Sequence, residues 1–133
     1  MVKAEQEWID LAIAALDQAY VPYSHFPVGA CLVTADGTLY QGVNIENASY
    51  GLTNCAERTA FFKAISEGKR QFKHLVIAGH TPEPISPCGA CRQVMAEFCT
   101  PEMPVTLLGD DGVMKETTVE ELLPYTFTNK DFH

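Results

Sequence analysis

The sequence predicts an α/β fold in which helices cover both faces of a mixed sheet of about five strands. Helix-like and strand-like patterns alternate along the chain, which is typical of a layered domain. Residues 74–79 (HLVIAG) form a continuous apolar run of strand length, as expected for a central strand that is covered on both faces. At 133 residues the chain has a common size for one domain, so we expect a three-layer α/β/α sandwich over residues 1–133.

The first elements are predicted to be a helix followed by a hairpin. Apolar residues recur at helical spacing over residues 3–20, with charged residues elsewhere on the helix surface. Two strand-like stretches, 28–33 and 38–45, flank Asp36-Gly37, which is a typical hairpin turn. Near the other end of the chain, the same patterns predict a strand and a short helix, at residues 105–108 and 119–123.

A helix with a cysteine near its start is predicted in the middle of the chain. Asn54 is a suitable N-cap for this helix, and Gly68 is a suitable end. This placement puts Cys55 and Glu57 in the first turn. A purely structural alternative is that Glu57 only closes a capping box with Asn54.

A second pair of cysteines lies at the start of another predicted helix. Ser86 is a suitable cap, Pro87 suits the first helical position, and Pro101 lies beyond the end of the helix. Cys88 and Cys91 are three residues apart, so we expect them to face the same way. If both cysteine-bearing helices begin at the same end of the sheet, the three cysteines meet there.

The net charge and the apolar pattern exclude some classes of function. The formal net charge is −8, from 17 acidic and 9 basic residues, which leaves few cations to neutralise the phosphates of a polynucleotide. No apolar run reaches the roughly 18 residues of a membrane span, and the N-terminal segment carries acids, unlike a signal peptide. We therefore expect a cytoplasmic protein that binds neither polynucleotides nor membranes.

The cysteine pattern indicates a metal site with room for water. Five cysteines are an odd number, and a C-x-x-C pair in a reducing compartment indicates metal or redox chemistry rather than disulfides. Cys55, Cys88 and Cys91 lie at predicted helix starts, where backbone N–H groups favour the thiolate. Three thiolates can hold zinc with one open vertex, and Glu57 can exchange a proton with a water there. Because three thiolates and Zn²⁺ sum to −1, we expect Arg58 to offset the surplus charge.

The same residues admit other interpretations. A lone C-x-x-C is as often a structural or redox element, and Arg58 can be a solvated surface charge. A closed structural zinc site is a further alternative, in which Cys31, Cys99 or a histidine supplies the fourth ligand, although none has the short local spacing that such sites favour. Cys31 and Cys99 are otherwise expected to be core thiols.

Five motifs give the chain its resemblance to a known family. They are PYSHFPVGA at 22–30, NIENA at 44–48, CAER at 55–58, PCGACRQ at 87–93 and ELLP at 121–124. In this order, over nearly the whole chain, they resemble the small, homotetrameric, zinc-dependent cytidine deaminases with a three-cysteine zinc site. The resemblance implies hydrolytic deamination of cytidine and 2′-deoxycytidine to the uridines with release of ammonia, in pyrimidine salvage. A sister deaminase acting on another nucleobase or on a polynucleotide is the alternative.

The resemblance also assigns roles to the residues of the metal site. Cys55, Cys88 and Cys91 would ligate one zinc ion per subunit, and a zinc-bound hydroxide would attack the cytosine carbon that bears the amine. Glu57 would shuttle the proton. Arg58 keeps the role of charge neutralisation that the charge sum gives it.

The nucleoside pocket implied by the resemblance is shared between the subunits of a homotetramer. Asn44 and Glu46 would bind the ribose hydroxyls, the backbone of Ala56 would bind the base, and Phe26 would line it. A free nucleoside suits such a pocket, because a 5′-phosphate would add negative charge to an acidic protein. Residues expected at the walls between subunits are Ala48, Tyr50 and Phe127, the last of which would stack on the base.

Overall fold

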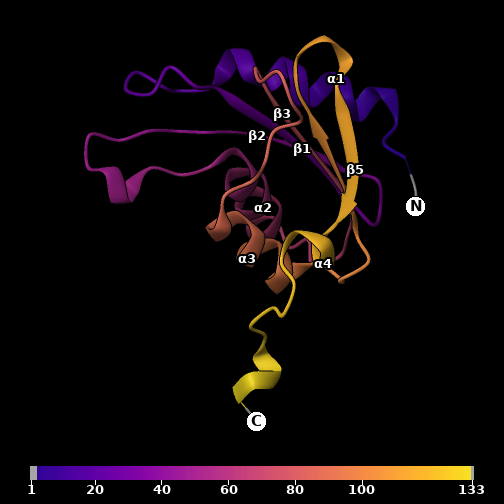
Figure 1. Cartoon of the computed structure of the whole chain (residues 1–133). Helices are drawn as coiled ribbons and strands as arrows, with labels where there is room; N and C mark the ends of the chain where they lie inside the picture. The colour runs from indigo at the N-terminus through magenta and orange to yellow at the C-terminus, as the bar shows by residue number, and fades with distance from the viewer. Residues whose placement is uncertain (1–2, 133) are drawn as a thin grey trace.

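The computed structural model describes residues 3–132 and confirms the predicted three layers. Helix α1 (Gln6–Ala15) covers one face of the sheet (Figure 1). The helices on the other face are α2 (Ala56–Ser66), α3 (Gly89–Phe98) and α4 (Val119–Leu122). Residues 1, 2 and 133 of the predicted domain lie outside the described residues. No helix within residues 3–132 is long and apolar enough to cross a lipid bilayer.

Five strands form one mixed sheet in the order β2-β1-β3-β4-β5. The strands are β1 (Val28–Thr34), β2 (Leu39–Val43), β3 (Phe72–Gly79), β4 (Pro104–Leu108) and β5 (Met114–Thr118). Strands β3 and β4 are parallel, and the other neighbouring pairs are antiparallel. The apolar run predicted to be central is therefore the middle strand, where Ile77 pairs with Ala30 on one side and Leu107 on the other.

Side chains of the central strands alternate between two apolar cores. Ala30 and Leu32 of β1 face α2 and α3, whereas Cys31 and Val33 face α1. Phe61 of α2 is fully buried in the first core, and burial of such a side chain stabilises the fold by about 1.5–3 kcal/mol. This packing fixes α2 against the sheet and so determines where its N-terminus lies.

A glycine on β2 allows α2 to lie unusually close to the sheet. A Cβ atom at Gly42 would be 2.1 Å from the carbonyl oxygen of Ala56 and 2.7 Å from the backbone nitrogen of Ala60. Both atoms belong to the first turns of α2, so only a residue without a side chain fits at this position. The close contact helps to position the start of α2.

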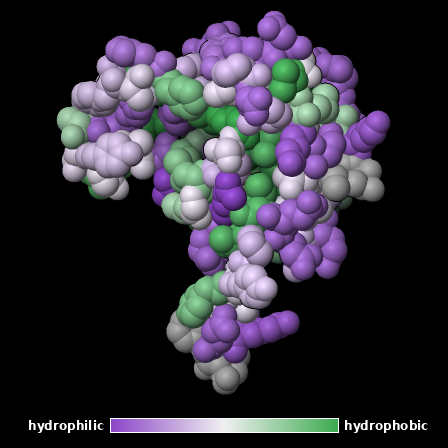
Figure 2. Space-filling view, viewed as in Figure 1, coloured by the Kyte–Doolittle hydropathy of each residue, from purple (hydrophilic) through white to green (hydrophobic). Residues whose placement is uncertain are grey.

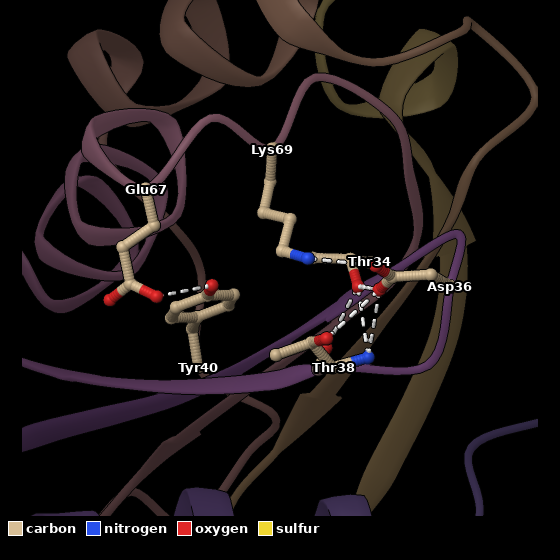
Figure 3. Close-up of polar contacts among 6 residues, drawn as sticks. All are labelled: Thr34, Asp36, Thr38, Tyr40, Glu67 and Lys69. Atoms are coloured by element: carbon tan, nitrogen blue, oxygen red, sulfur yellow. Dashed lines mark hydrogen bonds and ion pairs between the residues drawn. The ribbon is translucent and has the colours of Figure 1, made fainter.

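The hairpin between β1 and β2 is tied to the end of α2 by polar contacts (Figure 3). Lys69 Nζ donates to Asp36 at 2.7 Å, and the hydroxyl of Thr38 donates to the same carboxylate at 2.9 Å. The hydrogen bond from Lys69, with those from the hairpin, lowers the pKa of Asp36. Nearby, the hydroxyl of Tyr40 donates to Glu67 at 2.8 Å.

Helix α1 and strand β5 differ from the sequence prediction. Helix α1 ends at Ala15 and continues as a short 3-10 turn, Leu16–Gln18, instead of running to residue 20. Strand β5 was not predicted as an element, because its sequence (MKETT) is polar and lacks an apolar alternation. It lies at the edge of the sheet, where it pairs with β4 and buries only Thr117 of its five side chains.

Candidate active site

The two cysteine-bearing helices begin at the cysteines themselves. Cys55 is the N-cap of α2 and Cys88 is the N-cap of α3, both with extended backbone. The predicted cap Asn54 and the predicted first helical residue Pro87 therefore lie one position before each cap, which corrects the predicted helix starts. Neither cysteine side chain makes a capping hydrogen bond, so both thiols are available to the site between the helices.

Three thiols meet at these helix starts. The Sγ atoms of Cys55 and Cys88 are 3.6 Å apart, and those of Cys88 and Cys91 are 3.4 Å apart. All three sulfurs lie within 4.8 Å of one another. Sulfurs that ligate one tetrahedral zinc ion at about 2.3 Å lie about 3.8 Å apart, so the donor set fits zinc.

The described residues provide no fourth ligand to close the tetrahedron. The cluster of potential ligands within residues 3–132 consists of the three cysteines. Cys31 lies in the core on the α1 face of the sheet, and Cys99 is the residue that ends α3. This arrangement counts against a closed structural zinc site and leaves one vertex for another ligand.

Arg58 lies where the charge of the thiols predicts a cation. Its Nη2 atom donates to Cys55 Sγ at 3.2 Å. Hydrogen bonds from Cys91 and Arg58 outweigh the effect of burial and lower the pKa of the Cys55 thiol to about 5. The pKa of Cys91 is raised, because its thiol proton is held in the hydrogen bond to Cys55. The site is thus built to carry thiolate charge beside a guanidinium.

Glu57 is a buried acid beside the thiols. Its side chain is 4% exposed, and burial raises the pKa of its carboxyl group. The alternative of a capping box is not supported, because the amide of Asn54 donates instead to Thr59 Oγ1 at 3.1 Å and no side chain caps α2. Burial thus makes this carboxyl group a better proton acceptor than an exposed carboxyl group, as a group that takes a proton and later releases it must be.

A small cavity of about 210 Å³ opens beside the thiols. It brings together four predicted residues, Glu57, Phe26, Asn44 and Ala56, with two of the cysteines. Sequence reasoning missed other lining residues, because apolar residues that face a cavity follow the same pattern as residues of the core. The apolar residues among them are Val28, Ile77, Ile85 and Pro87, and Ser86, which is predicted only as a helix cap, also lines the cavity.

Of the two predicted sugar-binding residues, Asn44 lines this cavity and Glu46 does not. Asn44 Oδ1 accepts from the backbone N–H of Val28 at 2.9 Å, and its Nδ2 donates to the carbonyl of Phe26 at 2.8 Å. Each amide atom keeps one hydrogen-bonding position, since an amide has two acceptor and two donor positions. Glu46 does not line the cavity but is half-buried two residues further along, bound to the loop that contains Ser24.

The three residues predicted to act between subunits do not line the cavity of their own chain. Ala48 and Tyr50 are exposed, the latter at 87%, in the long segment between β2 and α2. Phe127 lies in the tail that extends away from the body of the molecule (Figures 1 and 2), where its carbonyl accepts from Gln93 at 2.9 Å. A larger cavity, of about 770 Å³, lies between this tail, α4 and the end of α3, and none of the three clustered cysteines lines it.

Comparison with known proteins identifies the family. Residues 2–107 match the family model described as the cytidine and deoxycytidylate deaminase zinc-binding region. The chain belongs to this family. The match covers all three cysteines and Glu57, so the family's zinc-binding character agrees with the thiol cluster.

Individual relatives within the family match this chain over most of its length. A cytidine deaminase of Sporosarcina psychrophila is 61% identical over 117 residues, which are 88% of this chain and 86% of that protein. A cytidine deaminase of Halalkalibacterium halodurans is 55% identical over 128 residues, which are 96% of this chain and 97% of that protein. The crystal structure of cytidine deaminase from Burkholderia pseudomallei superposes with a TM-score of 0.91 at 49% identity, over 94% of this chain and 100% of that one.

Proposed function

We propose that the protein catalyses the hydrolytic deamination of cytidine and 2′-deoxycytidine to uridine and 2′-deoxyuridine, with release of ammonia, in pyrimidine salvage. The observation that carries this proposal is a cluster of three thiols with a buried carboxyl group beside it, where two of the thiols and the carboxyl group line one cavity. The names of the similar proteins, which are cytidine deaminases, point to the same substrate.

In the proposed reaction Cys55, Cys88 and Cys91 would hold one zinc ion per subunit. A bound zinc ion supplies an activated water, because coordination lowers the pKa of water to about 7. Glu57 accepts a proton from the attacking water at its carboxylate and passes it to the amine of the substrate. The water oxygen adds to the ring carbon that bears the amine, the carbon–nitrogen bond breaks, and ammonia leaves. The second proton of the water passes to the adjacent ring nitrogen, so the oxygen remains as the carbonyl of the uridine product.

The surroundings of the thiols suit this role. The burial of Glu57 excludes bulk water from its carboxyl group, so the proton it holds is directed to the substrate. Arg58 offsets the negative charge of the thiolates. We assign the backbone of Ala56 and the ring of Phe26 to the base, because both line the same cavity.

The substrate is proposed to be a free nucleoside. Asn44 and Glu46 are assigned to the sugar hydroxyls, which a carboxylate and an amide bind well. A phosphate would instead approach a protein of net charge −8. A polynucleotide is disfavoured for the same reason.

We propose a homotetramer, with each active site completed by a neighbouring subunit. Ala48, Tyr50 and Phe127 are assigned to the walls between subunits, since they are exposed and lie outside the cavity of their own chain. The working unit is a single domain, residues 1–133, in the cytoplasm. Light scattering should report a tetramer. A monomer with full activity would contradict the assignment of Phe127.

The substrate is tested by following the loss of cytidine absorbance with the zinc-loaded protein. We expect turnover of cytidine and 2′-deoxycytidine, and none of guanine or RNA. Absence of cytidine turnover, or greater activity on guanine or RNA, would overturn the proposal. The cobalt-substituted protein should show an exchangeable water in its spectrum, whereas a fourth protein ligand without such a water would indicate a structural metal site.

A further inference from the structure

The carboxylate of Glu46 is held by three donors from one loop. Its Oε1 atom accepts from the backbone N–H groups of Tyr23 and Ser24, at 3.0 and 3.1 Å. Its Oε2 atom accepts from the hydroxyl of Ser24. The loop itself is joined to the Glu46 segment by a backbone bond from Glu46 N–H to the carbonyl of Tyr20 at 2.9 Å.

The hydroxyl of Ser24 also contacts the cavity wall. The backbone N–H of Phe26 donates to Ser24 Oγ at 3.0 Å. His25, between these two residues, has a left-handed backbone with φ of 57°, which bends the loop back so that this bond can form. Phe26 in turn accepts from the amide of Asn44. One hydroxyl therefore connects the carboxylate of Glu46 to the residues that line the cavity.

The hydrogen bonds of Glu46 leave room for one further donor on Oε2. A carboxylate offers about four acceptor positions, two on each oxygen. The two backbone N–H groups use both positions of Oε1, and Ser24 uses one of the two on Oε2. The second acceptor position of Oε2 can therefore accept a hydrogen bond from one additional donor. Its direction is set by Ser24, because no other hydrogen bond to Oε2 is formed by the described residues.

We propose that Ser24 is a positioning residue, whose hydroxyl orients Glu46 Oε2 to accept one hydroxyl of the substrate sugar. This inference rests on the proposed function, in which the substrate is a nucleoside. Of the hydroxyls that cytidine and 2′-deoxycytidine share, we assign the 3′-hydroxyl, which is attached directly to the sugar ring, as the donor. The hydrogen bond from Ser24 is the largest cause of the lowered pKa of Glu46, which keeps the carboxylate an acceptor.

Loss of the Ser24 hydroxyl is expected to change the position of the Glu46 carboxylate without affecting the folding of the chain. Loss of the Ser24 hydroxyl leaves both backbone bonds to Oε1 in place, so the loop stays attached to Glu46. In a variant without this hydroxyl, the orientation of Oε2 changes. The only proposed hydrogen-bond partner that Oε2 then has is the substrate. The effect should therefore appear in recognition of the sugar, and not in zinc content or in the unfolding midpoint.

The test compares Ser24→Ala with wild type on two substrates, cytidine and 3′-deoxycytidine. We expect kcat/KM for cytidine to fall about 10- to 100-fold, mainly through a higher KM. A hydrogen bond to a charged group contributes enough binding free energy to account for a loss of this size. With 3′-deoxycytidine, which lacks the hydroxyl, the variant should match wild type. Ser66→Ala, which removes another exposed side-chain hydrogen bond on α2, should leave both substrates unaffected.

A second pair of variants keeps the test valid if Ser24→Ala does not fold. Ser24→Thr retains the hydroxyl and Ser24→Val has the same shape without it, so only the threonine variant should retain discrimination between the substrates. Equal losses on both substrates, or no loss on cytidine, would overturn the role of Ser24 while leaving the proposed function intact. A wild-type protein that is inactive on cytidine would instead refute the proposed function, and this inference with it.

Discussion

Replacement of Gly42 by alanine tests how the sheet positions the metal site. The new Cβ would lie 2.1 Å from Ala56 O, 2.7 Å from Ala60 N and 2.9 Å from Ala60 Cβ. Because the nearest two are backbone atoms, no side-chain rotation relieves the contact. The start of α2 must move by about 1 Å to restore ordinary contact distances. Cys55 and Glu57 move with it.

The expected cost follows from this overlap. Overpacking of a well-packed core costs about 1–3 kcal/mol, and the backbone contact places Gly42→Ala at the upper end of that range. Urea unfolding should therefore show a loss of about 3 kcal/mol, and metal analysis should show less zinc per chain. Gly51→Ala is the matched control, because nothing lies within 4 Å of its Cβ position, and its stability should stay within about 0.5 kcal/mol of wild type. Wild-type stability and zinc content in Gly42→Ala would refute this account of the packing.

Two further predictions concern charge. Arg58→Gln removes the guanidinium that donates to Cys55 Sγ, so retention of zinc against a chelator should fall about 10- to 100-fold; unchanged retention would show that the guanidinium does not support the site. His74 is fully buried, with Nε2 bonded to Thr106 Oγ1 at 2.8 Å, and burial lowers its folded pKa below the unfolded value of about 6.5. The unfolded chain then binds more protons, so the stability is fully present above about pH 6.5 and is lost as the pH falls below it. Urea midpoints at pH 7.5 and 5.5 should differ more for wild type than for His74→Gln, and equal differences would argue against this role.

The metal site could be predicted from sequence because its chemistry is carried by residue types that stand out. Cys55, Cys88 and Cys91 lie at helix starts that nearby capping residues and prolines mark. The predicted helix starts lie one residue early for α2 and two residues early for α3. The reason is that cysteine is not a residue type that sequence patterns recognise as an N-cap, and neither cysteine makes a capping hydrogen bond. The negative charge of three thiolates and one Zn²⁺ predicts a nearby cation, for which Arg58 is the candidate. The hydrogen bond from Arg58 to Cys55 Sγ agrees with that prediction.

Other parts of the structure left weaker signals in the sequence. Strand β5 is polar and is defined by its pairing with β4, a contact between segments that no local pattern contains. Ile77 and Ile85 line the cavity but follow the pattern of core residues. The contact between Ser24 and Glu46 joins residues 22 positions apart, and only the folded loop brings them together. The proposed contacts of Tyr50 and Phe127 with other subunits would involve residues of a second chain, which no pattern within one sequence reveals.

In the proposed mechanism Glu57 moves a proton at a metal site built from three thiols. This role is tested most directly by measuring zinc content and cytidine turnover in the same preparation of Glu57→Gln. We predict wild-type zinc content with turnover reduced by about 10²- to 10⁴-fold, because the amide preserves the shape of the carboxyl group but cannot exchange the proton. Wild-type turnover in this variant, or loss of zinc together with turnover, would contradict the claim.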